Sequence, residues 1–198
     1  ALIAIGVAVW WFTRDPVEVA YQKCLDQVAD GMDKSVSGSG NAVTQVACEY
    51  FKRRAGIDVL HYEFRVDFPA RAWPDTIRFA ATTTAVRRDV MSLALDLAAS
   101  MQVDSTRVNG ARVAFTRPGD SVRVALPRGR NDTVRVAVFY RGLPTDGLIV
   151  RRDTLLGWTA FGDNFPDRAR QWLATVDHPS DKALVDWIVR APSTHRVI

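Results

Sequence analysis

Apolar and polar residues alternate regularly through the middle of the chain. From His61 to Phe68 the sequence reads HYEFRVDF, which places four apolar side chains on one face of a strand and polar ones on the other. Shorter candidate strands follow at residues 76–86, 90–97, 103–108, 112–116, 122–126 and 133–140. Turn residues separate them, and Asn109-Gly110 is a strong hairpin signal. Short strands joined by such turns predict a mainly β fold, an antiparallel β-sandwich or barrel.

The first quarter of the chain has a helical period instead. Asp15-Pro16 can start a helix, because Asp caps helices and Pro is favoured at the first helical position. Apolar residues then recur at helical spacing from Val17 to about Lys34, and again from Ala42 to about Arg54. A Ser- and Gly-rich turn joins the two stretches, so residues 14–55 are predicted to form a short antiparallel helical hairpin.

The only two cysteines, Cys24 and Cys48, fall on the two predicted helices. An antiparallel hairpin could bring them together. A disulfide would then contribute on the order of 3 kcal/mol and would place the hairpin outside the cytosol. Two separate buried thiols are the alternative, and the absence of a C-x-x-C spacing gives no indication of a metal.

The chain opens with an unbroken apolar run, Ala1–Phe12. These residues are too few to span a bilayer, which takes about 20, but Trp10 and Trp11 beside Arg14 are typical of a membrane interface. Because the chain begins with Ala rather than Met, we expect residues 1–13 to be the end of a longer apolar helix that anchors the protein in a membrane. A signal-peptide core and a buried helix are the alternatives. The expected localisation is membrane-anchored or exported, on the extracytoplasmic side.

The regular pattern lapses over most of the stretch from Trp158 to Ala183, WTAFGDNFPDRARQWLATVDHPSDKA. Long irregular segments inside a compact domain tend to be functional or to build an interface. Its arginines are expected to pair with nearby carboxylates, and Arg170 is the expected brace of the segment. Asp177, two residues before Pro179, is expected to cap a turn.

Four segments, in order, resemble the N-terminal β-domain of aminopeptidase N-type zinc metallopeptidases, the gluzincins. GIDVLHYEFRVDF resembles the opening strand of that domain, and VDSTRVNGARVAF resembles its V-x-S-V-x-V-N-G hairpin. VRVAVFYRGLPTDGLIV resembles the strand and turn that follow. The run F-G-D-N-x-P-x-R-A-R-x-W-L, followed by D-H-P-S-D-K-A, resembles the A-R-x-x-F-P-C-x-D-E-P segment before the catalytic domain. Over residues 56–198 the resemblance implies a twisted, saddle-like β-sandwich that flanks a zinc peptidase domain.

The motifs that carry catalysis in this family are missing from the sequence. Zinc is held there by H-E-x-x-H and a downstream Glu, and none of His61, His178 and His195 is followed by Glu. The G-A-M-E-N loop, which anchors a substrate's amino end, is absent as well. We therefore expect no catalytic residue, no metal ligand and no cofactor in this chain, with zinc held by a missing catalytic domain beyond Ile198.

The resemblance also implies one substrate contact. In the family a polar residue shortly before the A-R pair, often Gln, helps to bind the free amino group of the substrate. That position falls at Asp163, with Asn164 beside it, and a carboxylate suits an ammonium ion, so Asp163 or Asn164 is the expected substrate contact. Leu173-Ala174-Thr175 stands where the family has F-P-C, and His178 where it usually has Glu. We expect His178 to be a surface or turn residue.

Composition changes this picture little. The chain is 47% hydrophobic and 24% charged, with a net charge of +4, and its arginines alternate with apolar residues as on a solvated sheet face. Nucleic acid is therefore not an expected partner; the expected partners are peptides, in an intact enzyme, and a membrane through residues 1–12. Two alternatives stay open. One is a complete, membrane-tethered binding module without activity, and the other is a chimeric reading frame joined near Gly56.

Overall fold

The computed structural model describes residues 56–70, 76–129, 132–155, 157–165, 167–177 and 182–198. The chain divides between Ala55 and Gly56 into two units, and all of the described residues belong to the second. The expected membrane anchor, the helical hairpin and its two cysteines lie outside the described residues, as do His178 and Pro179. Within the part of the chain that is described, no helix has the length and apolar character needed to cross a bilayer.

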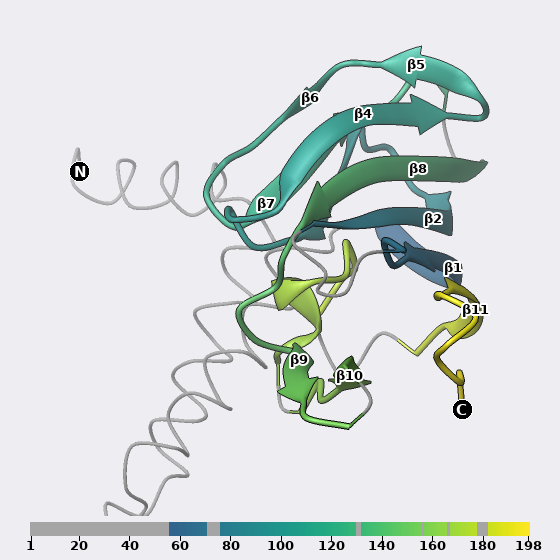
Figure 1. Ribbon diagram of the computed structural model, residues 1–198. Helices are drawn as coiled ribbons and strands as arrows, with labels where there is room; N and C mark the ends of the chain where they lie inside the picture. The colour runs from purple at the N-terminus through teal and green to yellow at the C-terminus, as the bar shows by residue number, and fades with distance from the viewer. Residues whose placement is uncertain (1–55, 71–75, 130–131, 156, 166, 178–181) are drawn as a thin grey trace, which may run out of the picture. The chain divides into compact units, whose positions relative to one another are not determined.

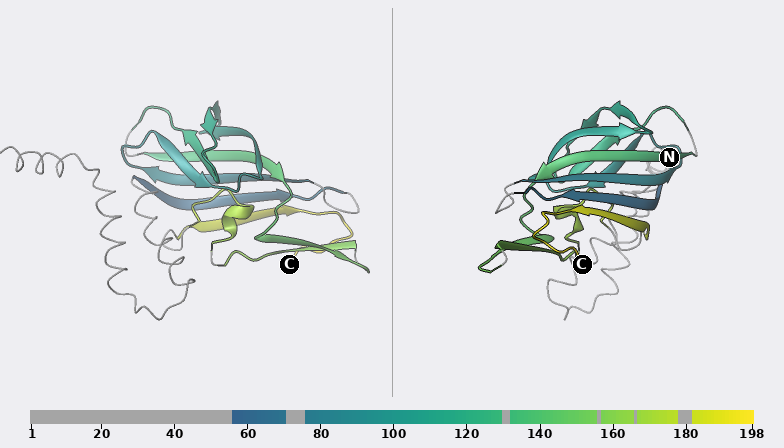
Figure 2. Two further views of the ribbon diagram at one scale, coloured as in Figure 1. Left: turned by 90° about the vertical axis from the view of Figure 1, so that its left-hand side faces the viewer. Right: turned by 45° about the vertical axis from the view of Figure 1, so that its right-hand side comes forward.

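A six-stranded sheet forms the main layer of the second unit (Figure 1). Its strands, in spatial order, are β11 (Leu184–Arg190), β1 (Ile57–Asp67), β2 (Ile77–Arg87), β8 (Thr133–Gly142), β4 (Gln102–Val108) and β5 (Ala111–Val113). Neighbouring strands are antiparallel except β1 and β11, which are parallel. The other views show how strongly this sheet is twisted (Figure 2).

Two smaller groups of strands complete the described unit. A three-stranded sheet has the order β3 (Ser92–Asp96), β7 (Ser121–Ala125) and β6 (Phe115–Thr116). A separate hairpin consists of β9 (Leu148–Asp153) and β10 (Gly157–Gly162), and a 3-10 turn, η1, covers Ala169–Gln171. Irregular backbone joins β10 to η1 and continues from η1 to Asp177.

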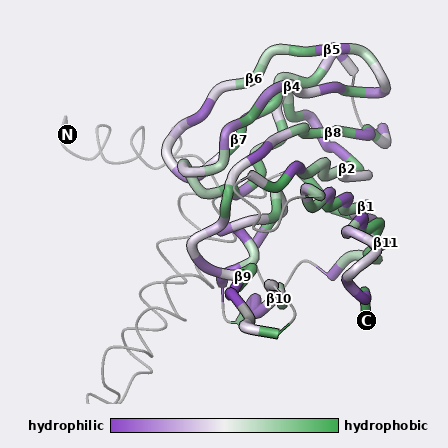
Figure 3. The backbone as a smooth tube through the Cα atoms, viewed as in Figure 1, coloured by the Kyte–Doolittle hydropathy of each residue, from purple (hydrophilic) through white to green (hydrophobic). Residues whose placement is uncertain are grey.

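The core lies between the six-stranded and the three-stranded sheets. Alternate residues of the long strands β1, β2 and β8 are buried, and the hydropathy of the residues alternates along the strands in Figure 3. Buried side chains of the large sheet pack with those of the small sheet in one cluster, which includes Phe64, Phe79, Val136, Leu95 and Val124. Together the two layers make the mainly β, sandwich-like fold that the alternation predicts.

The strand predictions can be compared with the structure one by one. The alternating runs at residues 61–68, 76–86, 90–97, 103–108, 122–126 and 133–140 correspond to β1, β2, β3, β4, β7 and β8. The predicted hairpin at Asn109-Gly110 is confirmed, because both residues have positive φ angles, 49° and 86°, as a type I′ turn requires. The run at residues 112–116 divides into β5 and β6, which belong to different sheets.

The sequence pattern missed β9, β10 and β11. Most residues of β11 are exposed, so its sequence LVDWIVR has no clean alternation of buried and solvated positions. Its parallel pairing with β1 also makes the large sheet mixed, where a purely antiparallel one was expected.

Candidate functional site

The irregular segment after β10, residues 163–177 without 166, is the candidate site and is called here the bracing segment. Backbone hydrogen bonds attach it to the rest of the domain at several points. The Asp163 N–H donates to the carbonyl of Gly147 at 2.7 Å, and the Ala98 N–H donates to the carbonyl of Arg170 at 2.8 Å. Asp96 and Thr175 exchange two backbone bonds, of 2.6 and 3.2 Å. The part from Trp172 to Val176 is buried.

Two tyrosines of the large sheet hold the buried part of the bracing segment. The Tyr140 hydroxyl donates to the carbonyl of Trp172 at 2.9 Å and accepts from the Ala174 N–H at 3.1 Å. The Tyr62 hydroxyl accepts from the Val176 N–H at 3.0 Å. The phenols thus satisfy backbone groups in the buried part of this irregular segment. Burial raises the pKa of Tyr140, so it stays a neutral phenol that can donate and accept at once.

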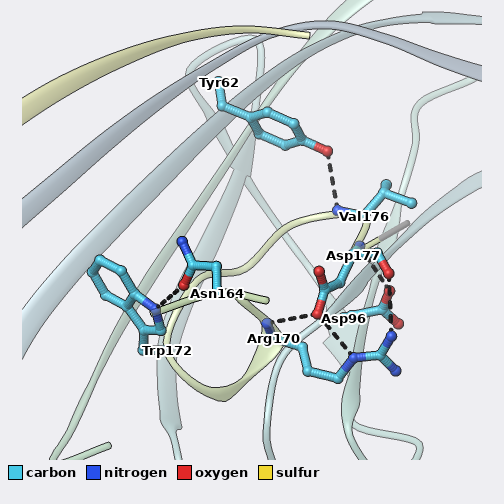
Figure 4. A network of polar contacts seen from close by, with 7 residues as sticks. All are labelled: Tyr62, Asp96, Asn164, Arg170, Trp172, Val176 and Asp177. Carbon is cyan, nitrogen blue, oxygen red and sulfur yellow. Dashed lines mark hydrogen bonds and ion pairs between the residues drawn. The ribbon is translucent and has the colours of Figure 1, made fainter. Parts of the chain in front are cut away.

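An ion pair closes the end of the segment (Figure 4). Arg170 Nε lies 3.1 Å from Asp177 Oδ2, its Nη2 donates to the Asp177 carbonyl at 3.2 Å, and its backbone N–H donates to Oδ2 at 3.0 Å. Asp96 Oδ2 accepts from the Asp177 N–H at 3.1 Å. The Arg170 and Asp177 side chains are only 17% and 10% exposed. Burial raises the pKa of Asp177, although the bonds from Arg170 act in the opposite direction.

Trp172 anchors the middle of the bracing segment. Its ring stacks on Trp187 at 5.6 Å between centroids and meets Phe79 edge-on at 6.2 Å. Its indole Nε1 donates to Asn164 Oδ1 at 2.9 Å (Figure 4). The side-chain oxygen of Asn164 is therefore engaged within the protein, and Asn164 orients the turn that carries Asp163.

Asp163 lies in a small, partly exposed charge cluster. Arg168 Nη1 is 3.2 Å from Asp163 Oδ2 and also 3.2 Å from Asp146 Oδ1. The carboxylates of Asp163 and Asp146 are 43% and 48% exposed. Two carboxylates sharing one guanidinium leave one negative charge in excess, which favours a cation at this place on the surface.

The predicted site residues thus have different partners and different exposure in the structure. It pairs Arg170 with Asp177 and Arg168 with Asp163, and it separates Asp163, which reaches solvent, from Asn164, which binds Trp172. The Asp177 carboxylate binds the Arg170 side chain and backbone N–H, and the expected turn at Pro179 lies outside the described residues. Whether these residues have the expected roles stays a prediction.

Four residues of the site were missed by the sequence reasoning: Tyr62, Asp96, Tyr140 and Asp146. Both tyrosines read only as inward positions of alternating strands, and Asp96 read as the polar side of one. Asp146 precedes Gly147 in a turn, which is an ordinary place for Asp. In the described ranges, no group of three or more His, Cys, Asp or Glu side chains could hold a metal ion.

Fold and site together define a β-sandwich domain whose bracing segment is held by buried tyrosines and an ion pair. Solved structures of zinc metallopeptidases resemble it. The M1 zinc metallopeptidase from Deinococcus radiodurans is 29% identical with a TM-score of 0.54, and the match covers 69% of this chain and 33% of that one. A variant of the Deinococcus protein bound to a Tyr-Ser-Ala substrate is 30% identical, with a TM-score of 0.53 and coverage of 68% and 33%.

A more distant likeness supports the fold alone. Leukotriene A4 hydrolase from Saccharomyces cerevisiae is 18% identical, with a TM-score of 0.56 and coverage of 69% of this chain and 24% of that one. A scan against protein-family models and a search of curated proteins find no match. The resemblance to zinc metallopeptidases of the aminopeptidase N family is nevertheless confirmed, and it holds at the level of a domain. The chain spans about a third of the length of the Deinococcus relatives.

Proposed function

We propose that this chain provides the non-catalytic β-domain of an aminopeptidase N-like zinc metallopeptidase, which removes N-terminal residues from peptides. The likeness to the Deinococcus metallopeptidase, at about 30% identity over two thirds of this chain, carries the proposal. A variant of that protein binds a Tyr-Ser-Ala substrate, and a variant of a two-domain M1 zinc metallopeptidase binds L-arginine and L-tryptophan, which points to peptides with a free amino end as the substrate class. Zinc would be bound and used by residues outside this chain.

Within such an enzyme, Asp163 is the proposed contact for the amino group of the substrate. Its carboxylate is partly exposed, and the excess negative charge that it shares with Asp146 favours an ammonium ion. Arg168 holds Asp163 in place, and Asn164 acts through its bond to Trp172 rather than on the substrate. The bracing segment would then form one wall of the substrate cleft.

The proposal extends to the location of the protein. The apolar run Ala1–Phe12 with its two tryptophans supports a membrane anchor, and a disulfide between Cys24 and Cys48 would fit an extracytoplasmic compartment.

The reading frame downstream of Ile198 gives the first test. A frame that encodes G-A-M-E-N and H-E-x-x-H supports the proposal, and an immediate stop codon favours the membrane-tethered binding module. In the product of such a frame, Asp163→Asn should raise the KM for aminoacyl substrates by about tenfold, because one charged contact is lost, while kcat changes little. Asn164→Asp, which keeps an oxygen acceptor for Trp172 and removes no charge, is the matched control and should not raise KM. Equal KM values for the parent and Asp163→Asn would remove Asp163 from the site.

The 198-residue chain alone should show no zinc-dependent hydrolysis, because it contains neither the H-E-x-x-H motif nor the G-A-M-E-N loop of the family. Aminoacyl reporter substrates should stay intact with added zinc, as measured by release of the chromophore. Turnover by the purified chain that a chelator abolishes would contradict the assignment of a non-catalytic domain.

A further inference from the structure

Strand β11 forms one edge of the six-stranded sheet, beside β1 (Figure 1). The Phe68 N–H donates to the carbonyl of Arg190 at 2.9 Å, so the backbone groups of Arg190 face β1. Because successive residues of a strand point their backbone groups to opposite sides, those of Val185, Trp187 and Val189 face away from the sheet. No other described strand pairs with this side of β11. The outer edge therefore offers a row of backbone donors and acceptors.

Apart from two charged side chains, Asp186 and Arg190, this edge lacks the features that usually prevent strand pairing. Leu184, Val185 and Trp187 are 75%, 44% and 47% exposed, and the strand contains no proline. The opposite edge of the same sheet, β5, is only three residues long and carries an exposed arginine, Arg112. Short, charged edge strands resist pairing, whereas a longer and apolar one invites it.

We infer that β11 pairs with β11 of a second copy of this chain, antiparallel about a two-fold axis at Ile188. In this register Asp186 of each copy lies opposite Arg190 of the other. Asp186 lies 3.0 Å from His61 Nε2 and Arg190 lies 3.7 Å from Asp67 within the chain, but the two side chains remain 73% and 68% exposed. They have opposite charge, so the strand is complementary to itself. The pairing would join two six-stranded sheets into one continuous sheet. The inference does not depend on the proposed peptidase role.

The backbone geometry agrees with this register. It places Trp187 opposite Val189 of the second copy, and the backbone groups of both point outward, as a hydrogen-bonded antiparallel pair requires. Their side chains lie on the inner face of the sheet, as does Phe64, which is in register with Trp187. The half-exposed Trp187 ring would thus gain an apolar neighbour across the two-fold axis. Centring the axis on Trp187 instead would place Asp186 opposite Ile188 and leave both charges without a partner across the interface.

The pair of Asp186 and Arg190 across the interface permits a charge-reversal test. Misfolded variants would not regain association when they are mixed, so a restored dimer would support the register. Arg190→Asp and Asp186→Arg each place like charges opposite one another in the homodimer, which should weaken self-association of the full chain by about tenfold. An equimolar mixture of the two variants restores both opposite-charge pairs, so it should associate as tightly as the parent chain. Sedimentation velocity over a range of concentrations measures all four samples, and circular dichroism checks that each variant is folded.

Several results would overturn the inference. If the parent chain stays monomeric at every concentration, β11 does not pair with a second copy of the chain. Its outer edge could then pair only with a strand of a different polypeptide. A parent dimer that neither variant weakens would place the contact elsewhere, for example in residues 1–55, which contain neither Asp186 nor Arg190. Variants that both lose association and do not regain it on mixing would exclude the proposed register.

Discussion

Arg170 is the residue on which the bracing segment depends most. Its guanidinium and its backbone N–H both bind Asp177, and its side chain is largely buried. Arg170→Ala would leave a buried carboxylate without its cation, so we expect a loss of about 3 to 5 kcal/mol in the free energy of unfolding. Arg168→Ala is the matched control, because the Arg168 pairs are more exposed and should contribute under about 1 kcal/mol. Denaturant titrations of both variants measure the difference, and equal midpoints would refute the bracing role.

The pH dependence of Arg170→Ala follows from the pKa of Asp177. Burial already raises this pKa in the folded parent chain, and removing Arg170 should raise it further. A carboxyl group whose pKa is higher in the folded than in the unfolded state binds more protons when folded, so its protonation stabilises the fold. The deficit of the variant should therefore shrink as the pH falls through the raised pKa of Asp177. A deficit that stays constant with pH would show that Asp177 is not the group left unpaired.

A substitution of Thr83 is expected to stabilise the domain, whereas Arg170→Ala is expected to destabilise it. Its side chain is fully buried on β2, and its hydroxyl has no hydrogen-bond partner within the described ranges. Thr83→Val replaces the hydroxyl by a methyl group of similar size and should stabilise the domain by about 1 kcal/mol. Thr106→Val is the control, because the equally buried Thr106 hydroxyl donates to the Val113 carbonyl at 2.9 Å and its loss should destabilise by about 1 kcal/mol. Thermal melts that move both variants in the same direction would contradict the prediction.

At the scale of elements, the turn before β9 fits closely against the bracing segment. Gly147 has a φ of 75°, and a Cβ there would lie 2.3 Å from the Arg168 carbonyl oxygen and 2.8 Å from Trp172 Cδ1. Gly147→Ala should therefore cost clearly more than the roughly 1 to 2 kcal/mol of a left-handed conformation alone. Gly110→Ala is the control, since Gly110 has a φ of 86° but no atom within 4 Å of its Cβ position. If Gly147→Ala and Gly110→Ala lose the same free energy of unfolding in a denaturant titration, the bracing segment can move to accommodate the added methyl group.

Elements were predictable from the sequence where one face of a strand is buried and the other solvated. HYEFRVDF and the later alternating runs show this contrast directly in the sequence. The turn was predictable because Asn-Gly is a residue pair that adopts the positive φ angles of a type I′ turn. Strand β11 was not predictable, because its exposed edge position imposes no alternation. Arg87 was not predictable either, although it is buried rather than exposed. It is fully buried at the end of β2, where its guanidinium binds Asp132 and the Pro127 carbonyl, partners that no local pattern identifies.

The candidate site was predictable only in part, for a related reason. Arg170 and Asp177 are close in sequence, as are Arg168 and Asp163, so these pairings could be expected from spacing. The tyrosines act over 34 and 114 residues, from Tyr140 to Ala174 and from Tyr62 to Val176. Their hydroxyls serve backbone groups that become neighbours only once both sheets have formed, and a single sequence carries no signal for such contacts.

At the scale of the whole molecule, the β-sandwich contains a complete core of its own. The main buried cluster of the described residues runs from Val59 to Val176, and the unit boundary falls between Ala55 and Gly56. A domain with its own core and a boundary outside it can usually fold alone. We therefore expect residues 56–198, expressed without the preceding 55, to retain a β-type circular dichroism spectrum and to unfold cooperatively.

Two truncations separate the contributions of the N-terminal residues. Removal of residues 1–12 should leave a folded chain that no longer sediments with membranes, because the apolar run is the expected anchor. Removal of residues 1–55 should shift the denaturation midpoint of the sandwich little, since the buried cluster from Val59 to Val176 stays intact. Aggregation or loss of the β-type spectrum after the first cut would mean that Ala1–Phe12 belongs to a core. The same result only after the second cut would mean that residues 13–55 cover apolar surface of the sandwich.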